Sequence, residues 1–460
     1  MKNRKKPAMN YRNPELGERF LRIILRAVSA AILALAPRPG TGEEIDEDAL
    51  FGDTSIMVET ERLTEANAVV DEREEKSVGF SGRVTASGGA HLSRAWFAEG
   101  GEDIDWDNTS LATAVLTGLE GDIRLPHSVK SYVTADMVYR GPDDSAAVHL
   151  REMFLDFNAD YTVFFRVGKQ ILQWGRGYFF NPVDLVNVEK TRFFDELTGR
   201  EGAMGIKAHA PFGTRVNLYS FVDLGRVSRL DSVAGAVKAE LLVGATECAV
   251  SLWGRQGEDP VYGFDFSSRL GSFSILGEAA LHQGIDTFSV VRSESGPLVR
   301  RESVARAPRV SLGAGRWLDF GNISDRIMVN VEGYYNHAGK DIRDLSSYLP
   351  PDFDPRDPAQ IEALLSYVPA EALALNTISR WYAATNVTIA RFVVTDMSLS
   401  ASLLYNIDQR CAQLTGGLHY ATLHDLSFDL LINGFAGDDY TEYTLWGRAV
   451  TVEARAGIVF

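Results

Sequence analysis

The sequence is poor in cysteine. Of its 460 residues only two, Cys248 and Cys411, are cysteines, and both fall in predicted strands. Their spacing matches neither a metal site nor a disulfide framework, so we expect two small wall residues, although the sequence leaves a bridge between them open. No metal and no cofactor is predicted.

Long apolar runs are also missing beyond the N-terminal region. No later segment is apolar over the length that a membrane-spanning helix needs. A chain of this kind crosses a membrane only as a closed barrel, because unpaired backbone groups are too costly in lipid.

An excess of basic charge is also lacking, because 46 Lys and Arg residues are outnumbered by 62 Asp and Glu and the formal net charge is -16. No basic stripe is present, which argues against nucleic acid as a partner.

Patterns for catalysis are missing too, because neither a nucleophile elbow nor an HExxH sequence occurs. The chain has eight histidines, of which His149, His209 and His419 fall in predicted strands. We therefore predict no catalytic residues and no enzyme, with an outer-membrane lipase or protease as the weaker alternative.

The N-terminus has the pattern of an export signal. Basic residues from Lys2 onward precede a short apolar core at 27–36, and the small residues Ala34 and Ala36 resemble a cleavage site. We predict a signal peptide at 1–36 and a bacterial outer-membrane destination. The alternative is an amphipathic helix of a cytosolic protein. Residues 37–76 are acidic and polar, and we interpret them as a periplasmic leader or a small plug.

Alternation of apolar and polar residues starts at Ser77 and continues to the end of the chain. Val78, Phe80 and Val84 fall on one face of the first segment, whereas Arg83 and Thr85 fall on the other. This period of two is typical of a strand with one apolar and one polar face. The whole of 77–460 is therefore predicted to be one all-β domain.

The pattern predicts about 18 strands, with 16 as an alternative, near the following ranges. They are 77–89, 110–124, 129–140, 146–157, 161–172, 203–211, 214–223, 233–243, 246–255, 260–270, 272–285, 306–319, 325–337, 379–391, 395–406, 410–421, 425–435 and 448–460.

The connections between these strands alternate in length. Every second connection is tight, as at 158–160, 212–213, 244–245, 270–271, 393–394 and 423–424, whereas the others are mostly long, as at 90–109, 173–202, 286–305, 338–378 and 436–447. This alternation is typical of an up-and-down antiparallel outer-membrane β-barrel with periplasmic turns and extracellular loops. Outer-membrane lipid is then the expected environment.

Two further segments carry signals of their own. The last predicted strand alternates and stops at Phe460, which resembles the signal that bacterial barrel-assembly machinery recognises. In the loop 338–378, Asp357 suits a helix N-cap and Pro358 the first helical position, so we expect one short helix. Two alternatives are open: this helix folds over the mouth of the barrel, or it is only a helical turn in a surface loop.

The stretch 164–187 begins as a strand and continues into glycines, aromatic residues and Asn-Pro, which cannot continue a ladder. If 158–160 forms the preceding turn, Glu152 lies opposite Arg166, with Asp156 and Gln170 on the same lumen face. Alternation places Lys169 on the lipid face, where its amine reaches the headgroups unless a bulge at Gly168 turns it inward.

The run 166–170 (Arg-Val-Gly-Lys-Gln), then Trp174-Gly175, then Asn181-Pro182-Val183-Asp184 resembles a group of uncharacterised Gram-negative outer-membrane barrels. More distantly it is similar to 18-stranded porins of the alginate-export type, although no arginine-rich lumen is evident. The resemblance implies an outer-membrane pore or transporter for an organic solute, and it covers only these residues and the following 198–203.

Two interpretations of this motif remain open. In one, Trp174, Asn181 and Pro182 lock a loop against the wall. In the other, a set of polar residues lines a constriction. These constriction candidates are Glu152, Asp156, Arg166, Lys169, Gln170, Arg176 and Asp184.

A polar strand face holds water, so a porin-like channel for small organic or hydrophobic solutes is the predicted function. The alternative is a structural or adhesive barrel that binds partners through its loops.

Overall fold

The computed structural model describes residues 77–93, 109–125, 128–186, 201–225, 233–255, 258–293, 296–349, 353, 358–367, 375–422, 425–445 and 448–460. The predicted signal peptide 1–36 and the acidic leader 37–76 lie outside these residues, as do Asp357 and the turn 423–424.

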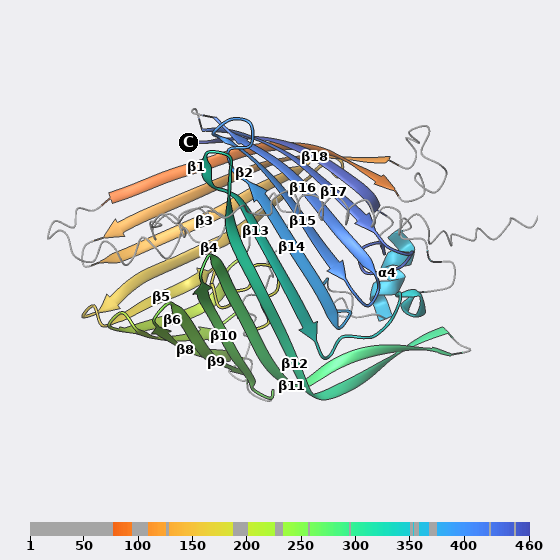
Figure 1. The fold of residues 1–460 in the computed structure, drawn as a ribbon, viewed down its shortest axis with the longest axis horizontal. Helices are drawn as coiled ribbons and strands as arrows, with labels where there is room; N and C mark the ends of the chain where they lie inside the picture. Colours follow the sequence, from red (N-terminus) through yellow and green to blue (C-terminus); the bar gives the residue numbers. More distant parts are fainter. Residues whose placement is uncertain are drawn as a thin grey trace, which may run out of the picture.

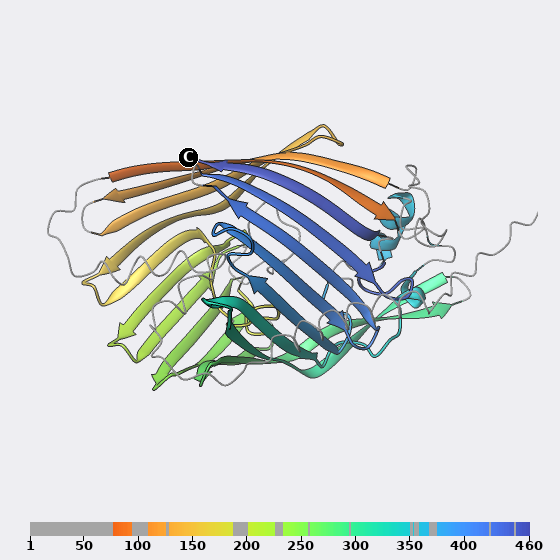
Figure 2. The same ribbon diagram turned by 45° about the horizontal axis from the view of Figure 1, so that its top comes forward.

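The described strands form one closed antiparallel barrel, as predicted. Each strand pairs with its neighbours in the sequence, and β1 also pairs with β18, so the ring of 18 strands has no free edge (Figures 1 and 2). The strands are β1 (Ser77–Ser93), β2 (Thr109–Leu125), β3 (Val129–Arg140), β4 (Ser145–Ala159), β5 (Val163–Gln170), β6 (Ala203–Phe212), β7 (Val216–Asp223), β8 (Ala234–Val243), β9 (Thr246–Arg255), β10 (Val261–Leu270), β11 (Phe273–Ser293), β12 (Gly296–Phe320), β13 (Ile323–Asn336), β14 (Trp381–Ile389), β15 (Met397–Asn406), β16 (Cys411–Ala421), β17 (Leu426–Ala436) and β18 (Arg448–Val459).

The two faces of the wall differ in polarity. Outward positions carry large apolar side chains with high exposure, such as Val148 at 73% and Leu312 at 59%. Inward positions carry polar side chains that are buried, such as Asp136 and Asp265. An apolar exterior and a polar interior on alternate residues are the pattern of a barrel whose outside faces lipid.

The two ends of the barrel differ in their connections. The turns 160–162, 244–245 and 271–272 are tight and lie at one end, which we name the turn end. The longest connections, 171–202 and 337–380, lie at the other end, which we name the loop end. One predicted loop is wrong: within 286–305, β11 and β12 continue as a paired hairpin through Ser293 and from Gly296, because their alternating residues keep the ladder going.

The register between β4 and β5 also corrects a prediction. Arg166 pairs with Asp156 rather than with Glu152, because the turn is 160–162 and β4 continues to Ala159. Asp160 and Tyr161 both adopt positive φ, as tight hairpins require, and Asn158 Oδ1 accepts a hydrogen bond from Tyr161 N at 3.1 Å. The turn moves by two residues and the partner of Arg166 by four, and because both shifts are even each side chain keeps its predicted face.

The predicted helix in the longest loop is present as α4 (Pro358–Tyr367). Its Leu364 belongs to a buried group that we name the outer-loop cluster: Leu345, Tyr348, Leu349, Phe353, Leu364, Ile378 and Leu445. The cluster joins the loop 337–380 to the loop 437–447, and Leu345 N donates to Tyr440 O at 2.8 Å. Figure 1 shows α4 at the loop end.

No helix among the described residues combines the length and the apolar character needed to cross a bilayer.

The two cysteines are free thiols in the wall, as expected, with Cys411 buried on β16.

The barrel closes where the C-terminus meets β1: Phe460 N donates to Gly82 O at 2.9 Å and Gly82 N donates to Phe460 O at 2.7 Å. A Cβ on Gly82 would lie 2.6 Å from the Phe460 ring, so the small residue makes room for the terminal aromatic. The role of Phe460 in assembly stays a prediction.

Gly168 on β5 is a position where the backbone requires glycine. Its φ is +134°, and a Cβ would lie 2.2 Å from Met153 O on β4. We expect Gly168→Ala to lower the free energy of unfolding by about 2–4 kcal/mol, through backbone strain and overpacking. Gly416→Ala is the control, because nothing lies within 4 Å of its added Cβ. Denaturant unfolding in detergent micelles measures both, and equal stabilities would contradict the prediction.

Candidate functional site

The connection between β5 and β6 enters the barrel. We name its first described part, residues 171–186, the inner segment. It leaves the wall after Gln170, and the chain returns at Gly202, whose N–H donates to Arg151 O on β4 at 2.9 Å. The contacts below show that the inner segment lies against the inward face of the wall from β6 to β14 (Figure 2).

Glycine gives the inner segment its tight path. A Cβ on Gly177 would lie 2.0 Å from Phe180 O, and one on Gly175 would lie 2.6 Å from a carboxylate oxygen of Glu278. A larger residue at Gly175 would press against the wall, and one at Gly177 would press against the segment's own main chain. Pro182, which needs no backbone acceptor, follows where the segment turns again.

Glu332 on β13 holds the middle of the inner segment. Its carboxylate accepts hydrogen bonds from three successive backbone N–H groups, those of Tyr178, Phe179 and Phe180, at 3.0, 2.9 and 2.9 Å. The Glu332 side chain is 2% exposed. Successive N–H groups that converge on one carboxylate form an anion-binding nest, and here the anion belongs to the wall.

Glu278 on β11 holds the flanks of the same stretch. It accepts from the backbone N–H of Arg176, from Gly177 N at 2.6 Å and from Val183 N at 3.2 Å. Hydrogen bonds to a charged group contribute about 1.5–3 kcal/mol each. We name Glu278 and Glu332 together the wall carboxylates.

The Arg176 side chain points to the wall. Its guanidinium donates to Asp265 at 2.6 Å, to Glu247, to Glu240 at 3.3 Å and to Ser267 at 3.2 Å. These partners lie on β8, β9 and β10, so one side chain bridges three strands. The fork of donors on arginine suits several acceptors at once.

Lys238 on β8 completes this charged group. Its amine donates to Trp174 O at 2.9 Å and lies 3.2 Å from carboxylate oxygens of both Asp265 and Glu240. Lys238 is nearly buried, so a charge at this position needs such partners. The main chain of the inner segment is thereby fixed at Trp174 as well as at the wall carboxylates.

Apolar side chains of the inner segment pack against the wall both near its ends and at its middle. Leu172, Trp174 and Val186 pack with Phe221 and Ala236 of the wall. In the middle, Phe179 and Phe180 join a group that includes Tyr334 on β13 and Tyr382 on β14. The rings of Phe180 and Tyr334 stack with centroids 4.9 Å apart. Such pairs add about 0.5–1.5 kcal/mol to the burial of their area.

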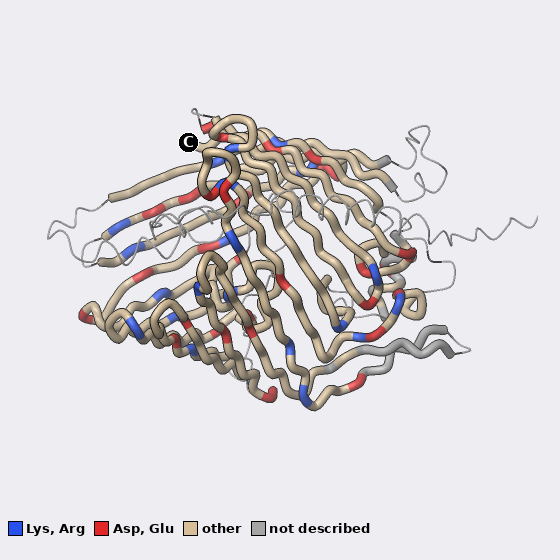
Figure 3. Tube along the Cα trace, viewed as in Figure 1, with Lys and Arg blue, Asp and Glu red and all other residues tan. Residues whose placement is uncertain are grey.

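The structure places four of the constriction candidates on the lumen face of β4 and β5. Arg166 makes a two-pronged hydrogen bond to Asp156 at 2.7 and 2.9 Å, and its guanidinium lies 3.9 Å from the centre of the Phe154 ring. Glu152 instead accepts from Ile171 N at 2.8 Å, where the inner segment begins. Gln170 is fully buried beside it. Figure 3 shows Lys and Arg beside Asp and Glu along the strands of this region.

Lys169 lies on the lipid face, as the alternation predicts, because its strand partners Met153 and Met204 are exposed apolar residues. The pairing of β4 and β5 runs through Gly168 without a shift, so no bulge is present. The Lys169 amine instead donates to Glu201 at 2.9 Å, and His149 lies 3.6 Å from the same carboxylate. The hydrogen bond from Lys169 lowers the pKa of Glu201 below its ordinary value. Lys169 and Glu201 thus lie where the connection between β5 and β6 leaves the wall and returns to it.

The remaining motif residues lie inside the segment. Trp174, Pro182 and Asp184 are buried. Asn181 O accepts from Asp184 N at 3.2 Å, which closes a turn around Pro182. The predicted loop-locking residues and the predicted constriction residues are thus neighbours in one element.

Sequence reasoning missed the partners on the far wall. Alternation assigns Glu332 to a polar strand face, but nothing in the sequence pairs it with Tyr178, which lies 154 positions away. The sequence likewise gives no sign that Glu278, Asp265 and Lys238 have partners in the inner segment. A signal exists: each is a charged residue on an inward position of a strand, and such residues require partners in a lumen.

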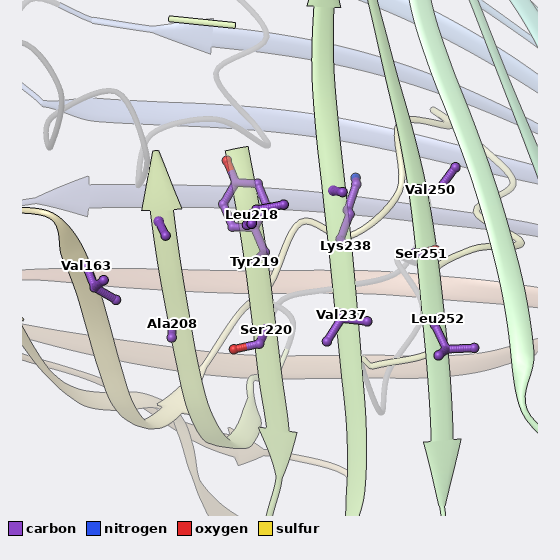
Figure 4. Close-up of a pocket in the computed structure, with 12 residues that line it drawn as sticks. Val163, Ala208, Leu218, Tyr219, Ser220, Val237, Lys238, Val250, Ser251 and Leu252 are labelled. Atoms are coloured by element: carbon purple, nitrogen blue, oxygen red, sulfur yellow. The ribbon is translucent and has the colours of Figure 1, made fainter. Parts of the chain in front are cut away.

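A separate depression lies in the wall between β5 and β9 (Figure 4). Its lining includes Leu218, Val237 and Val250, which are among the exposed apolar residues of the wall. Most of its lining therefore lies on the apolar exterior, although Lys238, whose amine belongs to the lumen site, also borders it. The described residues contain no group of three or more potential metal ligands.

No protein-family model and no curated protein matches the chain. Among solved structures it is similar to OccAB1 of Acinetobacter baumannii, with 10% identity over 85% of this chain and 99% of that one, at a TM-score of 0.49. It is similar to OccK2 (OpdF) of Pseudomonas aeruginosa, solved in complex with glucuronate, with 8% identity over 84% and 98% at 0.49. A mutant of the Rh. blastica porin has 10% identity over 84% and 100% at 0.39. Likenesses at this level carry no information about a solute.

Replacing Glu332 tests whether it holds the inner segment. We expect Glu332→Ala to speed hydrogen exchange at the amides of 178–180 by about tenfold to a hundredfold, because their acceptor is lost. Glu453→Ala is the control, since Glu453 lies on β18 and binds Arg455 at 2.7 Å. Exchange measured by mass spectrometry that is equal in both variants would show that Glu332 is not the anchor.

Proposed function

We propose that the protein is an outer-membrane channel that passes small organic or hydrophobic solutes through a polar lumen, with the inner segment as its constriction. The turn end then faces the periplasm and the loop end faces outward. The observation that carries this proposal is a stretch of chain fastened inside a closed barrel. A barrel needs no such element to span a membrane, whereas a channel needs one to limit what passes.

The contacts of the inner segment support a narrowing that is rigid. It is held by the wall carboxylates, by Arg176 and by Lys238, and therefore cannot move far from the wall without breaking several charged hydrogen bonds at once. The side of the segment away from these partners, together with β1–β5 and β15–β18, then bounds the path of the solute.

The lumen face beside this path supports a polar solute route. Inward residues on five neighbouring strands form a row of neutral hydrogen-bonding groups: Asn386, Ser402, Thr415, Asn433 and Thr451. Further along the same arc of the wall, Arg83 on β1 and Arg151 on β4 lie 3.4 and 3.6 Å from Asp136. Paired charges and hydroxyl groups hold water without giving the wall a large net charge.

The second candidate is a barrel that binds a partner through its loops. The outer-loop cluster favours it, because the cluster packs the loop 337–380 against the loop 437–447 into a built surface rather than leaving two separate loops. Under both readings the membrane environment, assembly through the C-terminal strand and the absence of catalysis remain proposals.

Planar-bilayer recording separates the two candidates. We expect the purified protein to conduct, and Phe180→Ala to raise single-channel conductance by about half or more, because the loss of its buried stack on Tyr334 frees the inner segment to shift. Phe428→Ala, on the apolar exterior, is the matched control. Solutes that are anionic, cationic or apolar are then compared by their block of the current. A folded barrel that stays silent would refute the channel.

A further inference from the structure

Glu442 is a buried carboxylate in the loop between β17 and β18. It is 2% exposed and accepts hydrogen bonds from the backbone N–H of Asn376, from Tyr382 Oη at 3.0 Å and from Asn406 Nδ2 at 2.6 Å. These donors belong to the end of the loop 337–380, to β14 and to β15. One side chain thus joins two long outer loops to two wall strands.

Neighbouring contacts strengthen the same junction. Tyr443 Oη donates to Asn376 Oδ1 at 2.7 Å, and Glu442 N donates to Gln409 Oε1 at 2.7 Å. The outer-loop cluster lies beyond it, with Leu445 from one loop and Ile378 from the other. The two loops therefore form one body that is attached to the wall through Glu442.

Tyr382 connects this body to the inner segment. Its hydroxyl binds Glu442, and its ring lies 6.1 Å from the Phe180 ring and 6.0 Å from the Tyr334 ring. Tyr443 belongs to the same buried group as Phe179 and Phe180. A continuous set of packed side chains therefore runs from the outer loops to the stretch that Glu332 anchors.

We propose that Glu442, acting through Tyr382, is a positioning residue that couples the outer loops to the inner segment, so that loosening the loops also loosens the proposed constriction. This inference rests on the proposed function only for its consequence for conduction. The coupling itself is a property of the fold and can be measured without a current.

The surroundings of Glu442 determine how pH acts on the coupling. The groups that face it are the hydroxyls of Tyr382 and Tyr443, the Cys411 thiol and the amides of Asn376, Asn406 and Gln409, and none of these is a cation. Burial without a cation raises the pKa of Glu442 to about 7. The folded-state pKa of Glu442 therefore lies above its value in the unfolded chain. The stabilisation that Glu442 contributes to the fold is complete below pH 4.5 or so and is lost as pH rises through 7.

Hydrogen exchange in the full-length protein tests the coupling. Tyr382→Phe removes only the hydroxyl, so the ring still contacts Phe180. We expect protection to fall about tenfold in both 441–445 and 178–180, because the hydroxyl's hydrogen bonds to Glu442 and from Ser379 N are lost and the effect spreads along the packed side chains. Tyr405→Phe is the matched control, since this tyrosine points away from the lumen and pairs with Ala383.

The double variant and the pH profile add independent readouts. Glu442→Gln combined with Tyr382→Phe should reduce protection of 178–180 by less than the product of the two single effects, because both act on one contact. Wild-type protection of 441–445, corrected for intrinsic exchange, should fall between pH 6 and 8, and Glu442→Gln should flatten that profile. The amides of 178–180 do not serve for this measurement, because they donate to a carboxylate of their own, Glu332.

Two results would overturn the proposal. One is a loss of protection confined to 441–445, with 178–180 unchanged. The other is a double variant in which the two single effects on 178–180 multiply in full, because Glu442 and Tyr382 would then act through separate contacts. A barrel that is silent in bilayers but shows coupled exchange would remove the channel and keep the coupling.

Discussion

The inner segment depends on one constraint: backbone N–H groups that leave a sheet and are taken out of water need acceptors. Six such groups between Arg176 and Val183 donate to the two wall carboxylates. The positions of Glu278 on β11 and Glu332 on β13 therefore fix the path of the segment. Its own side chains adapt to that path, with glycine where the backbone approaches its acceptors and aromatic rings where it meets the tyrosines of β13 and β14.

The same constraint explains why much of the barrel could be predicted from the sequence. In the wall, N–H groups are satisfied by neighbouring strands, so a period of two is enough to locate a strand and its faces. The predicted ranges match the 18 strands, and the error at 286–305 is one of length only. The register of β4 and β5 was less accessible, because it depends on whether Asn158 ends the strand or forms the turn.

The path of the inner segment could not be predicted in this way. Its sequence shows that a ladder stops after Gln170, because glycine and proline follow, but the acceptors that capture it lie on strands many residues later. Glu332 and Tyr178 are joined only by the closure of the barrel, which brings β13 across from β5. Local patterns therefore identify the element and its residues, whereas the partners require the fold.

The two readings of the motif, loop locking and constriction, are now distinguishable residue by residue. Arg176 has five donors in its guanidinium, and its partners Asp265, Glu247, Glu240 and Ser267 all belong to the wall. A side chain committed in this way cannot also bind a passing solute. Arg176 therefore locks the segment, and the width of the path follows from where the locked main chain lies. Arg166 and Asp156 differ, because they lie on the wall beside the path and remain available to a solute as a charged pair.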